Sequence, residues 1–325
     1  KYRNDGYILT QAIIPQQAIE DGVVEILVIE GFIDSINIEG NIATKRIGNY
    51  AKNLKGPKPL NSSDLEKNLL LINDLPGISS RTVISPSQTT IGAADITIQP
   101  QLDKYNFNAA LDNYGSRYIG PLQLSLSTQI NNILGNGESA IFQYVTDPDD
   151  NERTYLYSRI NAPVHHSGTM LGLDAAYSDT LPGYTLEPFQ VEGRYLKFGI
   201  DLNQPIIRSR TKNLFSTLRF DYLNLKSNNI VDTFTTQDEI AAIRLGLNYN
   251  NLDTIWKPAI NEFAVQISQG INVLDASTIN DPNLTRSDGD PQFTKIEGTL
   301  SRTQTVSNQI NLYTALKGQL SNNPL

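Results

Sequence analysis

The sequence holds few residues that are placed to do covalent chemistry. The only two histidines, His165 and His166, are neighbours, so on an extended strand their rings would point to opposite faces. The acidic turn at residues 147–150 lacks the spaced ligands and the distal glutamate of an EF-hand calcium loop. The motifs of serine hydrolases, zinc peptidases and phosphate-binding loops are absent. We therefore expect a protein that is not an enzyme and that holds no cofactor or metal.

Composition narrows the range of partners. The 325 residues carry a formal net charge of −8, whereas nucleic-acid binding needs a clustered basic face, so nucleic acid is excluded as a partner. No cysteine is present to form a disulfide or a thiolate metal site. No apolar run reaches the roughly 18 residues that a membrane-spanning helix needs. The chain starts at Lys1 without a signal peptide, so we expect it to begin and end inside a longer gene product.

The first hundred residues predict a small α+β region. Two strands are expected at 7–14 and 23–29, on either side of a turn that contains Pro15. The following segment predicts the order strand, helix, helix, strand, strand, at residues 33–38, 41–54, 63–75, 78–84 and 95–99. Asn41 is the expected N-cap of the first helix. Ser62 or Ser63 is the expected cap of the second, with Glu66 at the capping-box spacing from Ser63.

From residue 104 onward, apolar and polar residues alternate with a period of two, and no segment predicts a helix. The clearest stretches are residues 104–112, 122–127, 195–202, 243–249 and 263–268. Each stretch predicts a strand with one apolar and one polar face. A soluble β-sandwich alternates in the same way, so the alternation by itself leaves two folds open.

The lengths of the connections favour one of these folds. About eleven strands are expected before residue 320, joined alternately by short and long segments, as in outer-membrane barrels. Short connections are expected at residues 135–137, 163–168 and 306–308, and long ones at 179–193, 227–238 and 275–292. On such a barrel Arg219, Asp221 and Arg244 would face the water-filled lumen, where charge costs little free energy.

Several short motifs occur in a fixed order along the chain. They are Tyr2-Arg3-Asn4-Asp5-Gly6-Tyr7, Ile14-Pro15-Gln16-Gln17, Val28-Ile29-Glu30-Gly31, Leu71-Ile72-Asn73-Asp74-Leu75-Pro76-Gly77 and Asn203-Gln204-Pro205-Ile206-Ile207-Arg208-Ser209-Arg210. Together they resemble the motifs of the hemolysin secretion/activation proteins, which are the outer-membrane transporters of two-partner secretion. The matches span nearly the whole chain.

The resemblance implies a fold of α+β POTRA modules, which are small periplasmic domains, followed by an antiparallel transmembrane β-barrel. It assigns residues 1–31 to the C-terminal part of a first POTRA module and 32–100 to a second. Residues 101–325 become the N-terminal two-thirds of the barrel. The family's barrel has about sixteen strands, of which about eleven are expected in this chain.

The resemblance also implies export through the outer membrane. The modules would capture an unfolded secreted partner, of a kind that is β-helical once folded, and the barrel would thread it outward. We expect a monomer in outer-membrane lipid with periplasmic modules. Capture is predicted at an exposed strand edge that pairs with the partner, made by Ser79, Ser80, Arg81, Thr82, Val83 and Ile84. The pore-lining residues Arg219, Asp221 and Arg244 would be solvated wall residues, or would contact the passing chain or a plug.

Two other functions stay open at this point. One is insertion of other proteins into the outer membrane by a member of the same superfamily. The other is a soluble secreted β-rich binding protein or adhesin, in which the apolar strand faces would form a dry core.

Overall fold

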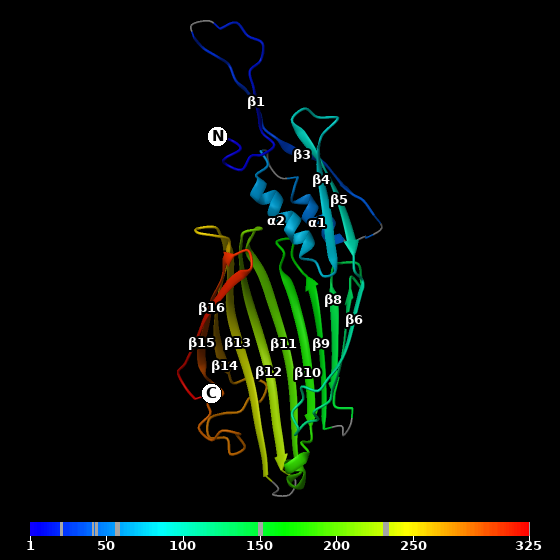
Figure 1. The fold of residues 1–325 in the computed structure, drawn as a ribbon, viewed down its shortest axis with the longest axis vertical. Coiled ribbons are helices and arrows are strands. Elements are labelled where there is room, and N and C mark those ends of the chain that lie inside the picture. Colours follow the sequence, from blue (N-terminus) through cyan, green and yellow to red (C-terminus); the bar gives the residue numbers. More distant parts are fainter. Residues whose placement is uncertain are drawn as a thin grey trace. The chain divides into compact units, whose positions relative to one another are not determined.

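The computed structural model describes residues 1–19, 22–40, 42, 45–55, 59–148, 152–229 and 234–324, without the side chain of Phe234. This part of the chain divides into two compact units, of which the first comprises Lys1–Asp103, Asn132–Gly137 and Arg208–Arg210 and the second comprises the rest. The first unit holds two α-helices and two small sheets, and the second holds a sheet of eleven strands (Figure 1). Within the described ranges, no helix combines the length and the apolar character needed to cross a membrane.

The first unit confirms the predicted order of elements. A short antiparallel pair comes first, β1 (Gln11–Ile13) with β2 (Leu27–Ile29), so these strands are shorter than the alternation predicts. The elements that follow are β3 (Phe32–Ile38), α1 (Lys45–Lys52), α2 (Ser62–Asn73), β4 (Ile78–Pro86) and β5 (Ala93–Leu102). Asn41, the expected cap of the first helix, lies outside the described residues.

The N-cap of α2 differs from the prediction. Asn61, rather than Ser62 or Ser63, is the cap, and its Oδ1 accepts a hydrogen bond of 2.9 Å from the Ser63 N–H. Asparagine and serine cap helices about equally well, so the sequence pattern left the choice to local geometry. Ser62 and Ser63 lie inside the helix, and the predicted capping box from Ser63 to Glu66 is wrong.

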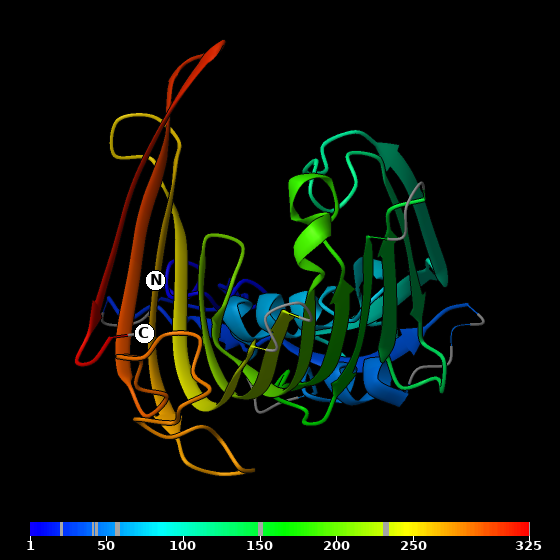
Figure 2. The same cartoon turned by 90° about the horizontal axis from the view of Figure 1, so that it is seen from below.

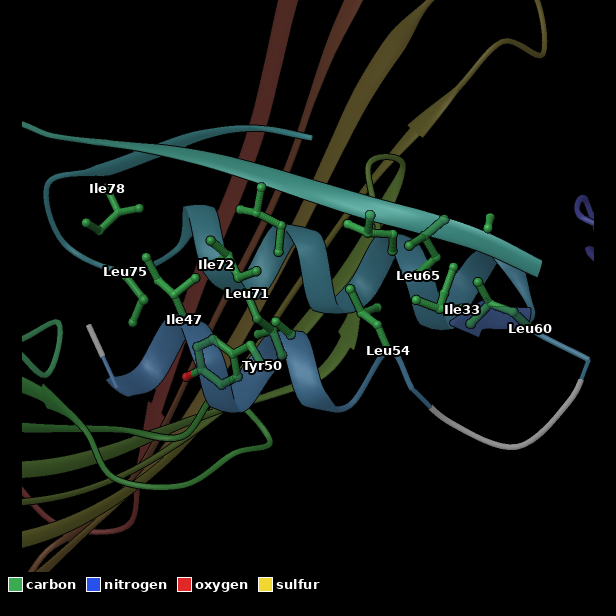
Figure 3. Packing of buried hydrophobic residues seen from close by; sticks show 14 residues of the cluster. Ile33, Ile47, Tyr50, Leu54, Leu60, Leu65, Leu71, Ile72, Leu75 and Ile78 are labelled. Atoms are coloured by element: carbon green, nitrogen blue, oxygen red, sulfur yellow. The ribbon is translucent and has the colours of Figure 1, made fainter. Parts of the chain in front are cut away.

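A three-stranded sheet packs against the helices. β5 is its central strand, parallel to β3 and antiparallel to β4, so β4 is an edge strand. Figure 3 shows Ile47 and Tyr50 of α1 turned toward Leu71 and Ile72 of α2. Fourteen buried apolar residues form this core, and at about 25 cal/mol per Å² their burial is the main force that holds the unit together.

Replacing Ile72 by alanine is expected to destabilise the first unit. Ile72 has no exposed surface, and truncating such a side chain costs about 3 kcal/mol because a cavity remains. Denaturant unfolding followed by the fluorescence of a probe in the first unit measures the loss. The exposed Gln101→Ala on β5 serves as the control, with a change below about 0.5 kcal/mol. Equal effects of the two substitutions would contradict this assignment of the core.

The second unit is a meander in which each strand lies beside the strand before it. Its strands are β6 (Tyr105–Asp112), β7 (Gln123–Asn131), β8 (Ser139–Thr146), β9 (Arg153–Pro163), β10 (Met170–Thr180), β11 (Val191–Arg208), β12 (Lys212–Asn229), β13 (Phe234–Asp253), β14 (Ala259–Ile271), β15 (Thr294–Ser307) and β16 (Ile310–Ser321). Figure 2 shows this sheet curled into an open trough, with β6 and β16 at its two edges. The predicted strand number and the five clearest stretches are confirmed.

The connections follow the predicted alternation, with two corrections. The predicted loop at 227–238 is largely strand, because Ser227 pairs with Thr236 and Leu225 with Asp238, and residues 230–233 lie outside the described part. The loop at 179–193 is also shorter, because Thr180 pairs with Gly193, and a 3-10 helix (Tyr184–Phe189) lies within it. In both places polar residues continue the strand.

The two faces of the large sheet reverse the usual pattern of burial. The apolar face exposes large side chains such as Phe198 (50%) and Leu245 (52%), whereas Asp174 (7%) and Asp221 (6%) are buried on the polar face. A soluble sandwich would bury the apolar face and hydrate the carboxylates. The second unit therefore does not have the dry core that the soluble alternative requires. Its exposed apolar face is stable only in contact with an apolar medium such as the hydrocarbon of a membrane.

Candidate functional site: a free strand edge and a charged network

The predicted capture residues lie on one strand. Ser79, Ser80, Arg81, Thr82, Val83 and Ile84 all belong to β4. β4 pairs with β5 along one side, and no other strand of the described sheet pairs with its second side. The prediction that this segment is a strand edge therefore agrees with the topology, and its role in binding stays a prediction.

Hydrogen bonding shows which backbone groups of β4 point away from the sheet. The Ser80 N–H donates to Asn73 Oδ1 at 2.6 Å instead of to β5, where Ser80 lies opposite Pro100. Because antiparallel pairs alternate between bonded and non-bonded, the N–H groups of Thr82 and Ile84 point to the same outer side. Pro86 has no N–H to offer. The open edge is thus short and offers two donors, from Thr82 and Ile84.

The end of this edge is held by a carboxylate on β3. Asp34 accepts hydrogen bonds from the hydroxyls of Ser87, Thr89 and Thr90, which lie in the loop between β4 and β5, at 2.9–3.0 Å. These hydroxyl donors, Thr90 first, lower the pKa of Asp34 below its ordinary value of 3.8. The loop therefore binds the charged form of the side chain.

Acidification is expected to release this loop. Because the pKa of Asp34 is lower in the folded state, its contribution is complete above the unfolded pKa of about 3.9 and is lost as the pH falls through the folded value. The protection factors of residues 87–92, which are their amide exchange rates relative to the intrinsic rates at the same pH, should therefore fall below about pH 4. Asp34→Asn should lower these protection factors at neutral pH and remove their dependence on pH. Unchanged protection in that variant would contradict the role of the carboxylate.

The predicted pore-lining residues are brought together on the polar face. Asp221 of β12 bridges two arginines: its Oδ1 accepts from Arg219 Nε at 2.8 Å and its Oδ2 from Arg244 Nε at 2.9 Å. Arg219 and Arg244 lie directly opposite each other in the register of β12 and β13. The carboxylate therefore stands between two cations that would otherwise repel.

The network continues over three further strands. Asp174 of β10 and Asp201 of β11 bind both Arg159 and Arg219, at N–O distances of 2.8–3.1 Å. Lys197 Nζ lies 3.6 Å from Asp221 Oδ1. Cross-strand ion pairs thus join β9 to β13 without a break.

Four of the seven residues of this network were not predicted as pore-lining residues, namely Arg159, Asp174, Lys197 and Asp201, although alternation places Lys197 and Asp201 on the polar face. A repeated Gly-x-Asp spacing, Gly172 to Asp174 and Gly199 to Asp201, was the available signal. The two histidines lie in the turn between β9 and β10, where His165 Nδ1 is 2.8 Å from Ser167 Oγ.

The connection between β14 and β15 folds back instead of extending freely. Pairing of β13 with β14 ends at Ala241, and beyond it Glu239 and Ser277 exchange hydrogen bonds of 2.8 and 3.0 Å. A Cβ on Gly270 would overlap the Pro291 carbonyl oxygen, so the connection covers the polar face at this point. A cavity of about 270 Å³ remains beside Arg244 and Asp221.

Family models match most of the chain. The model described as "Haemolysin secretion/activation protein ShlB/FhaC/HecB" matches residues 92–325, and that of the ShlB-type POTRA domain matches residues 1–31. The "Heme/hemopexin transporter protein HuxB" of Haemophilus influenzae (strain 86-028NP) is 26% identical over 255 residues, 76% of this chain and 44% of the relative. "Outer membrane transporter CdiB" of Dickeya dadantii is 27% identical over 135 residues, 41% of this chain and 24% of the relative. The chain thus spans less than half of these relatives.

Solved structures agree on the fold. CdiB from Escherichia coli matches with a TM-score of 0.82 and 19% identity, over 100% of this chain and 60% of that chain. BamA from Haemophilus ducreyi lacking POTRA domains 1-3 matches with a TM-score of 0.53 and 15% identity, over 97% of this chain and 62% of that chain. The resemblance seen in the motifs is confirmed, and the chain belongs to the haemolysin secretion/activation protein family ShlB/FhaC/HecB.

Proposed function

We propose that the protein exports an unfolded secreted partner across the outer membrane. The observation that carries the proposal is the large curled sheet with an exposed apolar face and an ion-paired polar face, in a chain of this family. Members of the family are outer-membrane proteins with periplasmic POTRA domains. In this proposal residues 32–100 are a second POTRA module, and a single copy of the protein works in outer-membrane lipid. The process requires no catalytic residue and no cofactor.

Capture is the first step. An extended segment of the partner pairs with β4, where the outward N–H groups of Thr82 and Ile84 and the carbonyl groups of the same residues supply main-chain hydrogen bonds. Main-chain pairing is largely independent of side chains, which suits a partner that arrives unfolded. Arg81 on the same strand adds a positive charge beside the edge.

Passage is the second step. The polar face offers amides, hydroxyls and neutralised charges, so an extended polar chain can move along it in water without burying unpaired groups. Since the sequence holds no nucleotide-binding motif, folding of the partner outside the cell supplies the driving force in this proposal.

Co-expression in an outer-membrane host tests the function. A gene for a candidate large secreted partner is expressed with and without the full-length transporter gene, and the partner is measured in the medium. The proposal expects secretion only when both are present. Retention of the partner in the periplasm, with normal levels of the transporter in the membrane, would contradict it.

The same cells test the insertase alternative, for which the likeness to BamA is a likeness of fold alone. Depletion of an insertase would lower the amounts of many outer-membrane proteins. Depletion of an exporter would leave them unchanged and would affect its partner alone.

A further inference from the structure

Two arginines of the polar face each bypass a neighbouring strand. Arg159 of β9 reaches over β10 to Asp201 of β11, with Nη1–Oδ1 2.9 Å and Nη2–Oδ2 3.1 Å. Arg219 of β12 reaches over β11 to Asp174 of β10, with Nη2–Oδ1 2.9 Å. Each guanidinium thus ties two strands that are not adjacent, and the two crossings run in opposite directions.

A glycine lies under each crossing. A Cβ on Gly172 of β10 would overlap Nη2 of Arg159, and a Cβ on Gly199 of β11 would overlap Nη2 of Arg219. In the register of β10 and β11, Gly172 is opposite Asp201 and Asp174 is opposite Gly199. The arrangement therefore has a local twofold symmetry that relates β10 to β11.

The symmetry depends on one register. If β10 slipped by two residues in one direction, Asp174 would lie opposite Asp201, and in the other direction Gly172 would lie opposite Gly199. A slip of β10 by one residue would turn Asp174 to the apolar face, while Asp201 on β11 would stay on the polar face. Both errors separate the arginines from their carboxylates.

All nitrogens of the two guanidinium groups are also engaged. Arg159 Nε donates to Asn161 Oδ1 at 2.7 Å, and its two terminal nitrogens donate to Asp174 and Asp201. Arg219 Nε donates to Asp221 at 2.8 Å, and its terminal nitrogens donate to Asp201 and Asp174. Every guanidinium nitrogen of the two arginines therefore has a partner in the sheet itself.

We propose that these residues form a clasp that fixes the register of β10 and β11 and withholds both guanidinium groups from the exported chain. The clasp consists of Arg159, Gly172, Asp174, Gly199, Asp201 and Arg219. Gly172 and Gly199 are positioning residues, since they leave the space that each guanidinium crosses. That the clasp withholds the guanidinium groups from an exported chain rests on the proposed function. That it fixes the register of β10 and β11 does not.

Glycine substitutions in the full-length protein test the register lock. Gly172→Ala and Gly199→Ala should each lower the temperature at which the folded form is lost on heating in SDS by about 5 °C, because the arginine must leave its carboxylate. The symmetry predicts similar shifts for the two. Gly246→Ala, on the polar face of β13, is the matched control, since the nearest atom to its Cβ would be 3.9 Å away. If both variants behave like this control, the clasp is wrong.

Ion selectivity tests the withheld charges. Asp174→Asn or Asp201→Asn frees a guanidinium, so channels in planar bilayers should favour chloride over potassium about twofold more than the parent does. Unchanged selectivity combined with lost secretion would mean that the arginines already contact the exported chain, which overturns the proposal. If the parent secretes no partner, the proposed function fails, while heating and selectivity still decide the clasp.

Discussion

Thr82→Pro should reduce secretion of the partner about tenfold while the first unit stays folded. The Thr82 N–H points away from β5, so proline removes a donor of the free edge and no bond of the sheet. Loss of one main-chain hydrogen bond and obstruction by the ring together cost about 1.4 kcal/mol or more, a factor of ten in affinity. Binding of an unfolded partner segment to the periplasmic region, measured by calorimetry, should fall by the same factor.

The control for this variant is Thr82→Val, which keeps the N–H and removes only the hydroxyl. It should bind the segment within about twofold of the parent, because main-chain pairing is independent of that side chain. Normal secretion by the proline variant would show that the partner binds elsewhere. Loss of secretion by both variants would point to a side-chain contact of Thr82 and against pairing.

Asp221→Asn should destabilise the sheet by about 2 kcal/mol. The substitution leaves Arg219 and Arg244 directly opposite each other with no carboxylate between them. Breaking a buried ion pair costs about 3–5 kcal/mol, and the partial exposure of both arginines reduces this figure. Urea unfolding of the full-length protein in lipid vesicles, followed by the shift in gel mobility, measures it.

Two features of that experiment are diagnostic. The decrease in the free energy of unfolding caused by Asp221→Asn should be smaller at high salt, because ions screen the repulsion between the two arginines. Asp288→Asn breaks an exposed ion pair with Arg286, in which Nε lies 2.6 Å from Oδ1, and should change stability by less than about 0.5 kcal/mol. Equal effects of the two substitutions would contradict the bridging role of Asp221.

The strands of the sheet were predicted well from the sequence, because the alternation of apolar and polar residues determines which face of a strand each residue occupies. It therefore placed Arg219, Asp221 and Arg244 together on the polar face, where they are found. Periodicity contains no register, and the bonds from Arg159 to Asp201 cross 42 positions of the chain. The network beyond β12 and β13 could not be derived until the pairing of β9, β10 and β11 was known.

Strand ends were predicted least well. Residues 227–229 and 235–238 are polar, and their composition suggests a loop, yet they belong to β12 and β13 and pair in register. The connection between β14 and β15 supplies part of the reason: the Gln237 N–H donates to the Asn283 carbonyl at 2.7 Å, and the connection thereby covers the β13 edge. Such long-range partners leave no local signal.

The first unit shows the same limit on a smaller scale. Its order of elements could be predicted from helix-breaking residues and from the spacing of apolar residues. Pro76 and Gly77, for example, stop α2 independently of what the helix packs against. That β4 lies at an edge depends on strand order, which no local pattern encodes. The bond from the Ser80 N–H to Asn73 then shows which of its donors are free.

Cross-linking during export tests the central claim most directly. A photoreactive amino acid is placed at Ile84 on the free edge, at the exposed Asn248 on the polar face of β13, and at Leu245 on the apolar face as the control, in the full-length protein. The secreted partner is stalled in transit by a folded domain fused to its C-terminus. Export along this sheet predicts cross-links to the partner from Ile84 and Asn248 and none from Leu245. Cross-links from neither of the first two positions, or equal cross-links from all three, would contradict export along this sheet.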